Sequence, residues 1–575
     1  MQSKRWDVVA GDGGLEEQLA VALRLSRLAA RLLVNRGITT IEGAQAFLNP
    51  SLQRLHDPFL MRGMAAAVER LSAGLQAQES MAIYGDYDVD GITATAVLGC
   101  FFRDIGVSVP YYLPHRMREG YGLNAEAVRQ LAAQGVRLLI TVDCGITGRE
   151  EVQLARQLGM DVIVTDHHQI PPKLPDAVAV LNPHQDDCPY PAKELAGVGV
   201  AFKLVTALRS HLRREPGWAS RLPNLRRHLD LVALGTIADI APLTDENRIL
   251  VRHGLQELTR SAKLGVQALK RVAKAEGQDV GVRQVGFGLA PRLNAAGRLA
   301  AAKAGVELLL CEDARQAEEL ASYLDDVNRE RQVVQAQIYE EAKGALETDG
   351  SPDERWGIVL ASERWHPGVV GIVASKLVEE YGRPAVLIGL EGEVGKGSGR
   401  SIAAFHLYRA LVACRDHLAG FGGHEHAAGL RIERHKVAAF REAFNRVVGE
   451  HLRAADRTPI LRLDAEVVLS EIDEAFMDFL TRLEPFGEGN PPPVLMARRV
   501  EVVGNPTLVG KEQQHLRLAI RQDGAVMRAI GFHMGEKLSE TRQRLLDIAF
   551  TPQRHIWNDL EERQLLLQDV KPHPG

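Results

Sequence analysis

Between residues 80 and 185, short apolar runs alternate with amphipathic stretches of helical spacing. The apolar runs have the length of strands and cover residues 80–84, 137–142, 160–165 and 177–181. Strands that are separated by helices and short loops predict βαβ units, and hence a parallel, doubly wound sheet in an α/β fold. Ligands of such sheets bind beyond the carboxyl ends of the strands, so the residues that follow these runs are the first candidates for a functional site.

Acidic and histidine side chains follow three of these runs in succession. They are Asp86, Asp88 and Asp90 after the first run, Asp143 after the second, and Asp166, His167 and His168 after the third. Any one of them could be a helix cap or a loop residue, but their recurrence at three strand ends predicts a shared site. Because carboxylates held close together repel one another, a cation is the expected occupant. An EF-hand calcium loop is excluded, because Val97 stands where its glutamate would be.

A further acid stands in an apolar, helix-like run over residues 231–242. An unpaired carboxylate in such surroundings is costly, so Asp239 requires a cationic partner. Either a metal ion or an arginine would serve, and we favour a metal. On that interpretation Asp239 joins the acids that follow the strands.

Two further segments follow the predicted sheet. Residues 312–348 are highly charged, free of proline and apolar at every third or fourth position, which predicts a long connecting helix. A second α/β segment comes next, with candidate strands at 356–360 and 385–390. The chain is therefore expected to contain two α/β domains joined by a helix.

Towards the C-terminus, apolar and polar residues alternate over 516–521 and 526–530, and Gln-Asp-Gly joins the two stretches. This pattern predicts a tight hairpin in a small β-barrel, for which an OB-fold is one candidate. The predicted organisation is an N-terminal extension (1–50), a doubly wound domain (51–311), a connecting helix (312–348), a second α/β domain (349–455) and an OB-like barrel (456–575).

Composition restricts the function classes. The net charge of −5 gives no global attraction to polyphosphate, so any nucleic-acid binding must come from local basic faces. The five cysteines are widely spaced and form no CxxC pair, which excludes a zinc ribbon and a disulfide scaffold. No apolar run reaches the ~18 residues of a membrane span, and the first residues lack the apolar core of a signal peptide. We therefore expect a cytoplasmic protein without a membrane contact.

Several motifs together carry a resemblance to a known family. They are Tyr-Gly-Asp-Tyr-Asp-Val-Asp-Gly at 84–91, Val-Asp-Cys-Gly at 142–145, Asp-His-His at 166–168 and Gly-Thr-Ile-Ala-Asp at 235–239. With these, the chain resembles the DHH phosphoesterase family. His-Pro-Gly-Val-Val-Gly at 366–371 and Gly-Gly-His-Glu-His-Ala-Ala-Gly at 422–429 resemble the DHH-associated domain. In its length and its predicted barrel, the chain is similar to the branch of this family that degrades single-stranded DNA. Two further motifs carry the same similarity, Asn-Ala-Ala-Gly-Arg at 294–298 and Pro-Phe-Gly-Glu-Gly-Asn-Pro at 485–491.

The resemblance implies a two-metal site. Its metal residues are Asp86, Asp88, Asp90, Asp143, His167 and Asp239, and its catalytic set is Asp88, Asp90, Asp143, His167, His168 and Asp239. Carboxylates with one or two imidazoles and no thiolate suit Mg²⁺ or Mn²⁺, and the histidine favours Mn²⁺. Two ions bridged by an aspartate can generate a hydroxide and neutralise the charge that develops on a phosphodiester.

The resemblance also implies a substrate and partners. The activity would be 5′→3′ degradation of single-stranded DNA to 5′-mononucleotides in recombination and repair. Residues that match the phosphate contacts are Arg116, Arg298, Ser398, Arg400, Gly423 and His424, and the sequence does not separate Arg116 from Arg118. The expected partners are a strand with a free 5′ end, a single-strand-binding protein and a RecQ-type helicase, and the chain is expected to be a monomer.

Two other functions stay open. Some relatives in this family act on short oligonucleotides, cyclic dinucleotides or pyrophosphate, but they resemble two-domain chains without the barrel. A DNA-binding scaffold that has lost its metals is the non-enzymatic alternative, although every matching ligand is present here. Residues 395–398 lack the first glycine of a P-loop, and residues 424–426 lack the second histidine of HExxH, so neither an ATP site nor a zinc protease is expected.

Overall fold

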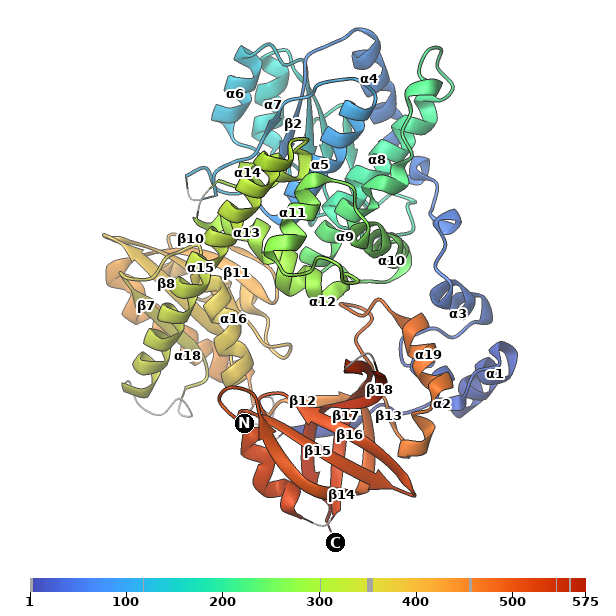
Figure 1. Cartoon of the computed structure of the whole chain (residues 1–575). Coiled ribbons are helices and arrows are strands. Elements are labelled where there is room, and N and C mark those ends of the chain that lie inside the picture. Colours follow the sequence, from blue (N-terminus) through green and yellow to red (C-terminus); the bar gives the residue numbers. More distant parts are fainter. Residues whose placement is uncertain are drawn as a thin grey trace. The chain divides into compact units, whose positions relative to one another are not determined.

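The computed structural model describes residues 4–116, 118–299, 301–348, 355–453, 458–543, 545–557 and 560–574 (Figure 1). The chain divides into two compact units. The larger unit is Leu52–Arg453, and the terminal unit combines Met1–Ser51 with Ala454–Gly575. The domain borders expected at 348/349 and 455/456 fall at residues 349–354 and 454–457, which lie outside the described residues.

The first sheet of the larger unit is parallel, as expected. Its strands are β2 (Met81–Gly85), β3 (Tyr111–Tyr112), β4 (Leu138–Val142), β5 (Asp161–Thr165) and β6 (Ala179–Leu181), in the order β3-β2-β4-β5-β6. The two-residue strand β3 was not predicted, because it is too short to show a period. The order reverses between β2 and β4, which is the switch point where such sheets place their ligands.

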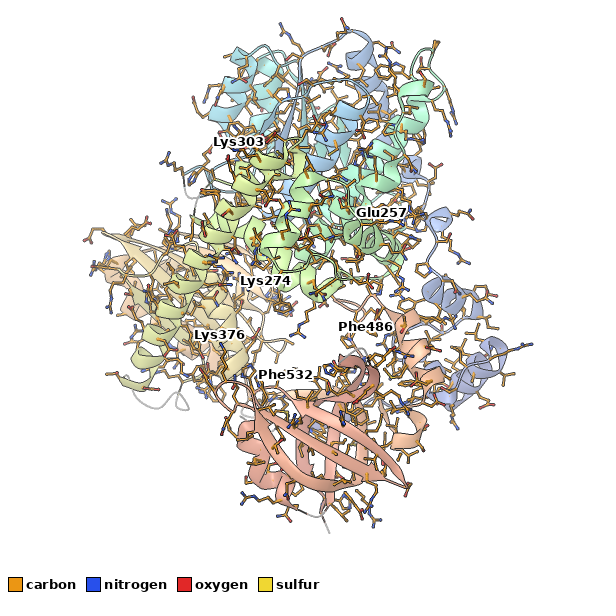
Figure 2. All side chains as sticks on the ribbon, in the orientation of Figure 1. Glu257, Lys274, Lys303, Lys376, Phe486 and Phe532 are labelled. Atoms are coloured by element: carbon orange, nitrogen blue, oxygen red, sulfur yellow. The ribbon has the colours of Figure 1, made fainter. Side chains whose placement is uncertain are left out.

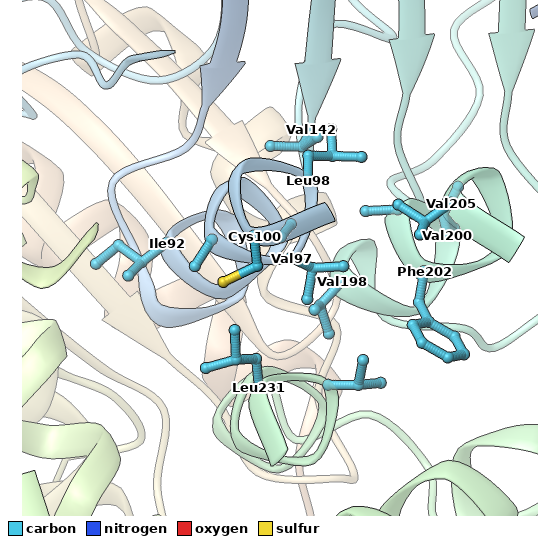
Figure 3. Packing of buried hydrophobic residues seen from close by; sticks show 14 of the residues in the cluster. Ile92, Val97, Leu98, Cys100, Val142, Val198, Val200, Phe202, Val205 and Leu231 are labelled. Atoms are coloured by element: carbon cyan, nitrogen blue, oxygen red, sulfur yellow. The ribbon is translucent and has the colours of Figure 1, made fainter. Parts of the chain in front are cut away.

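Helices cover both faces of this sheet, so the doubly wound fold is confirmed (Figure 1). Along β2, Ile83 packs with α4 (Met64–Gln76), α5 (Val89–Asp104) and α8 (Gly197–Leu212), while Ala82 and Tyr84 pack with α6 (Ala125–Ala133) and α7 (Arg149–Gln157). Successive strand residues point to opposite faces, and both faces are buried. Figure 3 shows the first of these cores, where Val97 and Leu98 of α5 meet Val142 of β4 and Val198 of α8.

A helical layer follows the sheet in the chain. Its members are α9 (Leu229–Ala238), α10 (Asp245–Thr259), α11 (Leu264–Val272), α12 (Val282–Gln284), the π-helical turn η5 (Val285–Leu289), α13 (Ala290–Leu299), α14 (Lys303–Leu310) and α15 (Ala314–Thr348). The predicted connecting helix is α15, and it starts two residues later than expected. None of the helices in the described part of the chain combines the length and apolar character that crossing a bilayer needs.

The second sheet of the larger unit is mixed. Its strands are β7 (Ile358–Ser362), β8 (Ala385–Glu391), β9 (Val394–Arg400), β10 (Gly420–Gly423) and β11 (Ala427–Glu433), in the order β10-β11-β9-β8-β7, and the helices α16 (Val370–Tyr381), α17 (Leu407–Ala413) and α18 (Val437–His451) belong to the same domain. β7 and β8 were predicted. β9 was not, because its glycines disfavour strands. A Cβ at Gly397 would lie 2.8 Å from Leu430 and one at Gly399 3.0 Å from Leu407, so the glycines make room for core side chains.

The terminal unit contains the C-terminal barrel. Its strands are β13 (Ala465–Glu466), β14 (Leu495–Val509), β15 (His515–Gln522), β16 (Ala525–Gly531), β17 (Leu545–Trp557) and β18 (Leu560–Pro572), and pairing of β14 with β17 closes the sheet. The expected hairpin joins β15 to β16, where Asp523 and Gly524 have φ values of 48° and 84°. Positive φ at both central residues is typical of the tight turn predicted there.

Candidate metal centre

The loop after β2 brings two carboxylates onto the start of α5. Asp88 caps the helix, because its Oδ1 accepts hydrogen bonds from Asp90 N at 3.0 Å and Gly91 N at 3.2 Å. Asp90 lies in the first turn, and its carboxylate accepts from Gly197 N at 2.6 Å and Val198 N at 2.8 Å, at the start of α8. A Cβ at Gly91 would lie 2.6 Å from the Asp86 backbone. Glycine at 91 therefore permits the close approach of loop and helix.

Asp143 and His167 approach Asp90 from the next two strands. Asp143 follows β4 with a φ of 59° and is 1% exposed, so it keeps a left-handed backbone in a packed site. His167 follows β5, and its Nε2 lies 3.1 Å from Asp143 Oδ1 and 3.7 Å from Asp90 Oδ2. The same nitrogen lies 3.9 Å from Asp239 Oδ2, at the end of α9. Side chains far apart in the sequence thus meet at the switch point.

Three sets of ligand atoms have a spacing that suits metal ions. They are Asp86 with Asp88 and Asp143, Asp143 with His167 and His168, and Asp90 with His167 and Asp239, and within each set the atoms lie within 4.8 Å of one another. Asp143 and His167 each belong to two sets. The structure therefore brings together all seven residues that the sequence analysis assigned to the metal and catalytic groups, in an arrangement with room for more than one ion.

The electrostatics of the cluster also fit a cation. Burial and the neighbouring carboxylates raise the pKa of Asp90 to about 7 and that of Asp239 to about 9, and they hold the pKa of Asp143 well above its usual range. Three buried atoms, Asp86 Oδ1, Asp143 Oδ1 and His167 Nε2, form no well-oriented hydrogen bond in the described part of the chain, although the last two lie 3.1 Å apart. Unpaired buried oxygens and an imidazole nitrogen are suitable ligands for a divalent ion such as Mn²⁺ or Mg²⁺.

Asp166 orients the imidazole ring of His168. Its carboxylate is fully buried, accepts from Ile146 N at 2.9 Å and lies 2.7 Å from His168 Nδ1. Burial opposes ionisation, but these bonds hold the pKa of Asp166 below its usual value. Partial burial lowers the pKa of the half-exposed His168, but the bond to Asp166 and its charge outweigh this effect and raise that pKa to about 9. Tyr121 Oη lies 3.0 Å from the same His168 nitrogen. The sequence analysis missed Tyr121, which stands in a loop that has no local signal.

A cluster of arginines lies beside the carboxylates. Burial, together with Arg116, Arg400 and Arg331, lowers the pKa of Arg298 to about 10. Arg298 donates to the Gly368 carbonyl at 3.1 Å. None of the four arginines forms an ion pair with a carboxylate among the described residues. Concentrated positive charge without acidic partners is suited to bind an anion such as a phosphate.

The other predicted phosphate contacts lie on the second sheet. Arg400 donates to Ser398 Oγ at 3.0 Å, and both stand on β9. Gly423 and His424 are exposed in the turn between β10 and β11, and no described hydrogen bond or ion pair joins His424 to the carboxylate cluster. Ala427 of β11 pairs with Arg400, so this turn adjoins the arginine strand. Arg331 on α15 was missed, because one arginine in a charged helix carries no distinguishing pattern.

The fold and the site together define a phosphoesterase of the DHH class that also carries a C-terminal barrel. Three family models match: the DHH family N-terminal domain over residues 80–236, the DHHA1 domain over 356–450 and the RecJ OB domain over 463–569. The single-stranded-DNA-specific exonuclease RecJ of Bacillus subtilis (strain 168) is 40% identical over 573 residues, covering 98% of this chain and 70% of that protein. The chain belongs to the RecJ family.

Further relatives agree. The single-stranded-DNA-specific exonuclease RecJ of Escherichia coli (strain K12) is 35% identical over 581 residues, covering 97% of this chain and 98% of that protein. The crystal structure of RecJ from Thermus thermophilus in complex with Mn²⁺ superposes with a TM-score of 0.84 and 29% identity, over 99% of this chain and 80% of the other. A structure of RecJ from the same organism contains Mg²⁺. The predicted α/β fold and OB barrel are confirmed, and the predicted ions, Mn²⁺ or Mg²⁺, are those that these RecJ structures contain.

Proposed function

We propose that this protein is a metal-dependent exonuclease that degrades single-stranded DNA from the 5′ end to 5′-mononucleotides, in recombination and repair. The observation that carries the proposal is the buried cluster of aspartates and histidines beside arginines that have no acidic partner among the described residues. The first group suits divalent ions and the second suits a phosphate. Their juxtaposition is what phosphodiester hydrolysis requires.

The metal ligands in this proposal are Asp88, Asp90, Asp143, His167 and Asp239, with Asp86 beside them and Asp143 shared between two ions. When bound, the ions activate water for attack and offset the charge that develops on the scissile phosphate. Asp166 fixes the orientation of the His168 ring through its 2.7 Å contact to Nδ1. The amides of Gly197 and Val198 hold the Asp90 carboxylate in one orientation.

The polarity and the product length come, in our proposal, from the arginine cluster. Arg116, Arg298 and Arg400, with Ser398, would bind a terminal 5′-phosphate and prevent the strand from advancing further. The hydrolysed bond would then lie one nucleotide from the end. Gly423 and His424 would contact the strand from the adjoining turn, where the absence of a side chain at Gly423 permits close approach of the backbone.

We also propose that the enzyme acts as a monomer in the cytoplasm with a single-strand-binding protein and a RecQ-type helicase. The helicase is expected because a duplex must be opened before one strand can be degraded from its end. Co-purification with, and stimulation by, each partner would test this.

The direct test is digestion of 5′-phosphorylated single-stranded and duplex DNA with Mn²⁺. Single strands should release 5′-mononucleotides, and a chelator should stop the reaction. Release from the 3′ end, or an unchanged rate with chelator, would contradict the proposal. Hydrolysis of a dinucleotide but not of a long strand would indicate a short-oligonucleotide phosphodiesterase instead.

Asp143→Ala tests the shared ligand. The variant should remain folded and lose nearly all hydrolysis, because a residue common to two ion positions is removed. Asp161→Asn is a matched control, since Asp161 starts β5 at the opposite edge of the same sheet and pairs with Arg70. The control should keep its activity. Near-normal turnover of Asp143→Ala would show that Asp143 is not a ligand shared by two ions.

A further inference from the structure

Phe287 has the largest exposed fraction, 83%, among the large hydrophobic side chains that the structure describes. It stands in η5, between Val285 and Leu289, which are both fully buried. The segment is therefore firmly packed through its neighbours, while the aromatic ring itself points to solvent. An aromatic ring that buried neighbours hold in a fixed position, with its faces open to solvent, is available to stack on another planar group.

The backbone around Phe287 is also unusual. α12, η5 and α13 follow one another without a gap, so they form one continuous helix from Val282 to Leu299. The π-helical turn lies near the start of this helix, and two residues after it stands Pro291, which has no amide hydrogen to donate. Single π-helical turns inside α-helices occur frequently at functional sites. Here the turn carries the exposed ring.

The same helix leads from Phe287 to the metal centre. Asn294 stands seven residues after Phe287, about two turns, and its Oδ1 accepts a hydrogen bond from Val89 N at 3.1 Å, next to Asp88. One further turn on is Arg298, a member of the arginine cluster. The π-helical turn rotates Phe287 away from the stripe that this spacing would give in a regular α-helix, but all three residues lie along one continuous helix. At ~1.5 Å per residue, Phe287 lies ~10 Å along the axis from Asn294 and ~16 Å from Arg298.

The surroundings of the ring are open and carry charges of both signs, since Glu276 and Asp279 are exposed in the loop that leads to it. A Cβ at Gly286 would meet nothing within 4 Å, and one at Gly288 would meet only Ala273 at 3.9 Å. Lys274, the residue after Ala273, is exposed and is labelled in Figure 2, and Arg283 is exposed one turn before Phe287. Neither cation has an ion-pair partner among the described residues. A planar, uncharged group attached to an anionic backbone would suit this surface.

We propose that Phe287 is a stacking platform for a nucleobase of the single strand, on the 3′ side of the hydrolysed bond and before the strand enters the metal centre. This inference rests on the proposed function. At ~3.4 Å per stacked nucleotide, the base on Phe287 is about three to five nucleotides from the hydrolysed bond. Every base has a π-face, so the contact accepts any sequence, while Lys274 and Arg283 attract the backbone. Phe287 is thus a positioning residue for long strands and touches no reacting atom.

The test compares Phe287→Ala with wild type on a long 5′-phosphorylated strand and on a 5′-phosphorylated dinucleotide, which is too short to reach the ring. KM for the long strand should rise about tenfold, as expected for loss of one stacked base. kcat should be unchanged, and so should both constants for the dinucleotide. Phe287→Trp should restore the wild-type KM, and its added fluorescence should be quenched by the strand. Phe59→Ala, another half-exposed phenylalanine of the same unit, is the matched control.

A strand with abasic positions at the fourth to sixth nucleotides separates stacking from general loss of binding. Wild type should then bind as weakly as Phe287→Ala, and the variant should lose nothing further. An unchanged KM for Phe287→Ala, or equal losses for wild type and variant on the abasic strand, would overturn the inference. Failure of the proposed function would differ, because wild type would then release no mononucleotide from either substrate.

Discussion

At the scale of single residues, glycine 197 shows how tightly the carboxylates are packed. A Cβ at Gly197 would lie 2.6 Å from Asp143 Oδ1 and 2.8 Å from Asp143 Cβ. The Gly197 amide also donates to Asp90 at 2.6 Å. Protein interiors are packed as densely as organic crystals, so there is no free volume for an added methyl group at residue 197. The methyl group would therefore displace the Asp143 side chain. The shape of the backbone, and not only the ligand types, therefore determines the site.

Gly197→Ala should raise the Mn²⁺ concentration that gives half-maximal hydrolysis by about tenfold, with a loss of unfolding free energy of about 1–3 kcal/mol from overpacking. A manganese titration and thermal unfolding would measure both. Gly344→Ala is the control, because a Cβ there meets nothing within 4 Å and the site lies in α15. It should stabilise by about 0.4–1 kcal/mol and leave the Mn²⁺ dependence unchanged. An unaltered Mn²⁺ requirement in Gly197→Ala would show that Asp143 can move without loss.

At the scale of elements, one histidine connects the end of α5 to the start of α9. His228 is 1% exposed, and its Nε2 lies 2.9 Å from the Asp104 carboxylate. Its Nδ1 is buried without a hydrogen-bond partner among the described residues. Burial lowers the pKa of His228 below its usual value of 6.5. The folded protein thus holds a neutral imidazole, since a second proton would have no acceptor.

This arrangement predicts acid sensitivity. Below about pH 6.5 the unfolded chain takes up a proton at residue 228 and the folded chain resists it, so acid favours unfolding by up to about 1.4 kcal/mol per pH unit until the folded pKa is reached. His228→Gln should be less stable at neutral pH but should lose less stability between pH 7 and pH 5. Parallel stability curves for wild type and variant, measured by urea unfolding at each pH, would contradict this.

Elements were predictable where their pattern is local. The strands at 81–85, 138–142 and 161–165 and the helix over 314–348 follow their periodic apolar residues closely. β9 was not predictable, because its glycines are explained only by Leu407 and Leu430 across the core. The turn η5 was not predictable either, because its own residues have no pattern that indicates a π-helix.

At the scale of the whole molecule, both ends of the chain build one core. The helices α1 (Gly13–Leu23) and α2 (Arg27–Val34) contribute Leu19, Leu32 and Leu33, which are fully buried and cluster with α19 (Glu474–Leu483) and the barrel strands. β1 (Arg5–Val8) pairs with β12 (Ile460–Leu463). The segment described from sequence as an extension is therefore part of the unit that contains the barrel.

Truncation should reveal this dependence. A fragment of residues 1–453 keeps the N-terminal helices but lacks their partners, so its exposed leucines should make it aggregate. A fragment of residues 52–453 should stay monomeric and folded and should hydrolyse short 5′-phosphorylated oligonucleotides with Mn²⁺. Size-exclusion chromatography and an activity assay would distinguish them. Equal solubility of the two fragments would show that the N-terminal helices are stable without the barrel.

The parallel sheet, the long helix, the barrel and the polar residues at three strand ends were predictable from the residue pattern alone, because they depend on neighbours within a few positions. The sequence also identified the ligand types, and hence a preference for Mn²⁺ or Mg²⁺. Tertiary contacts were needed to show that Tyr121 lies against His168, that Arg331 joins the arginine cluster and that Phe287 is exposed on the helix that leads to the metals. Those facts depend on contacts between residues far apart in the chain, and local periodicity carries no information about such contacts.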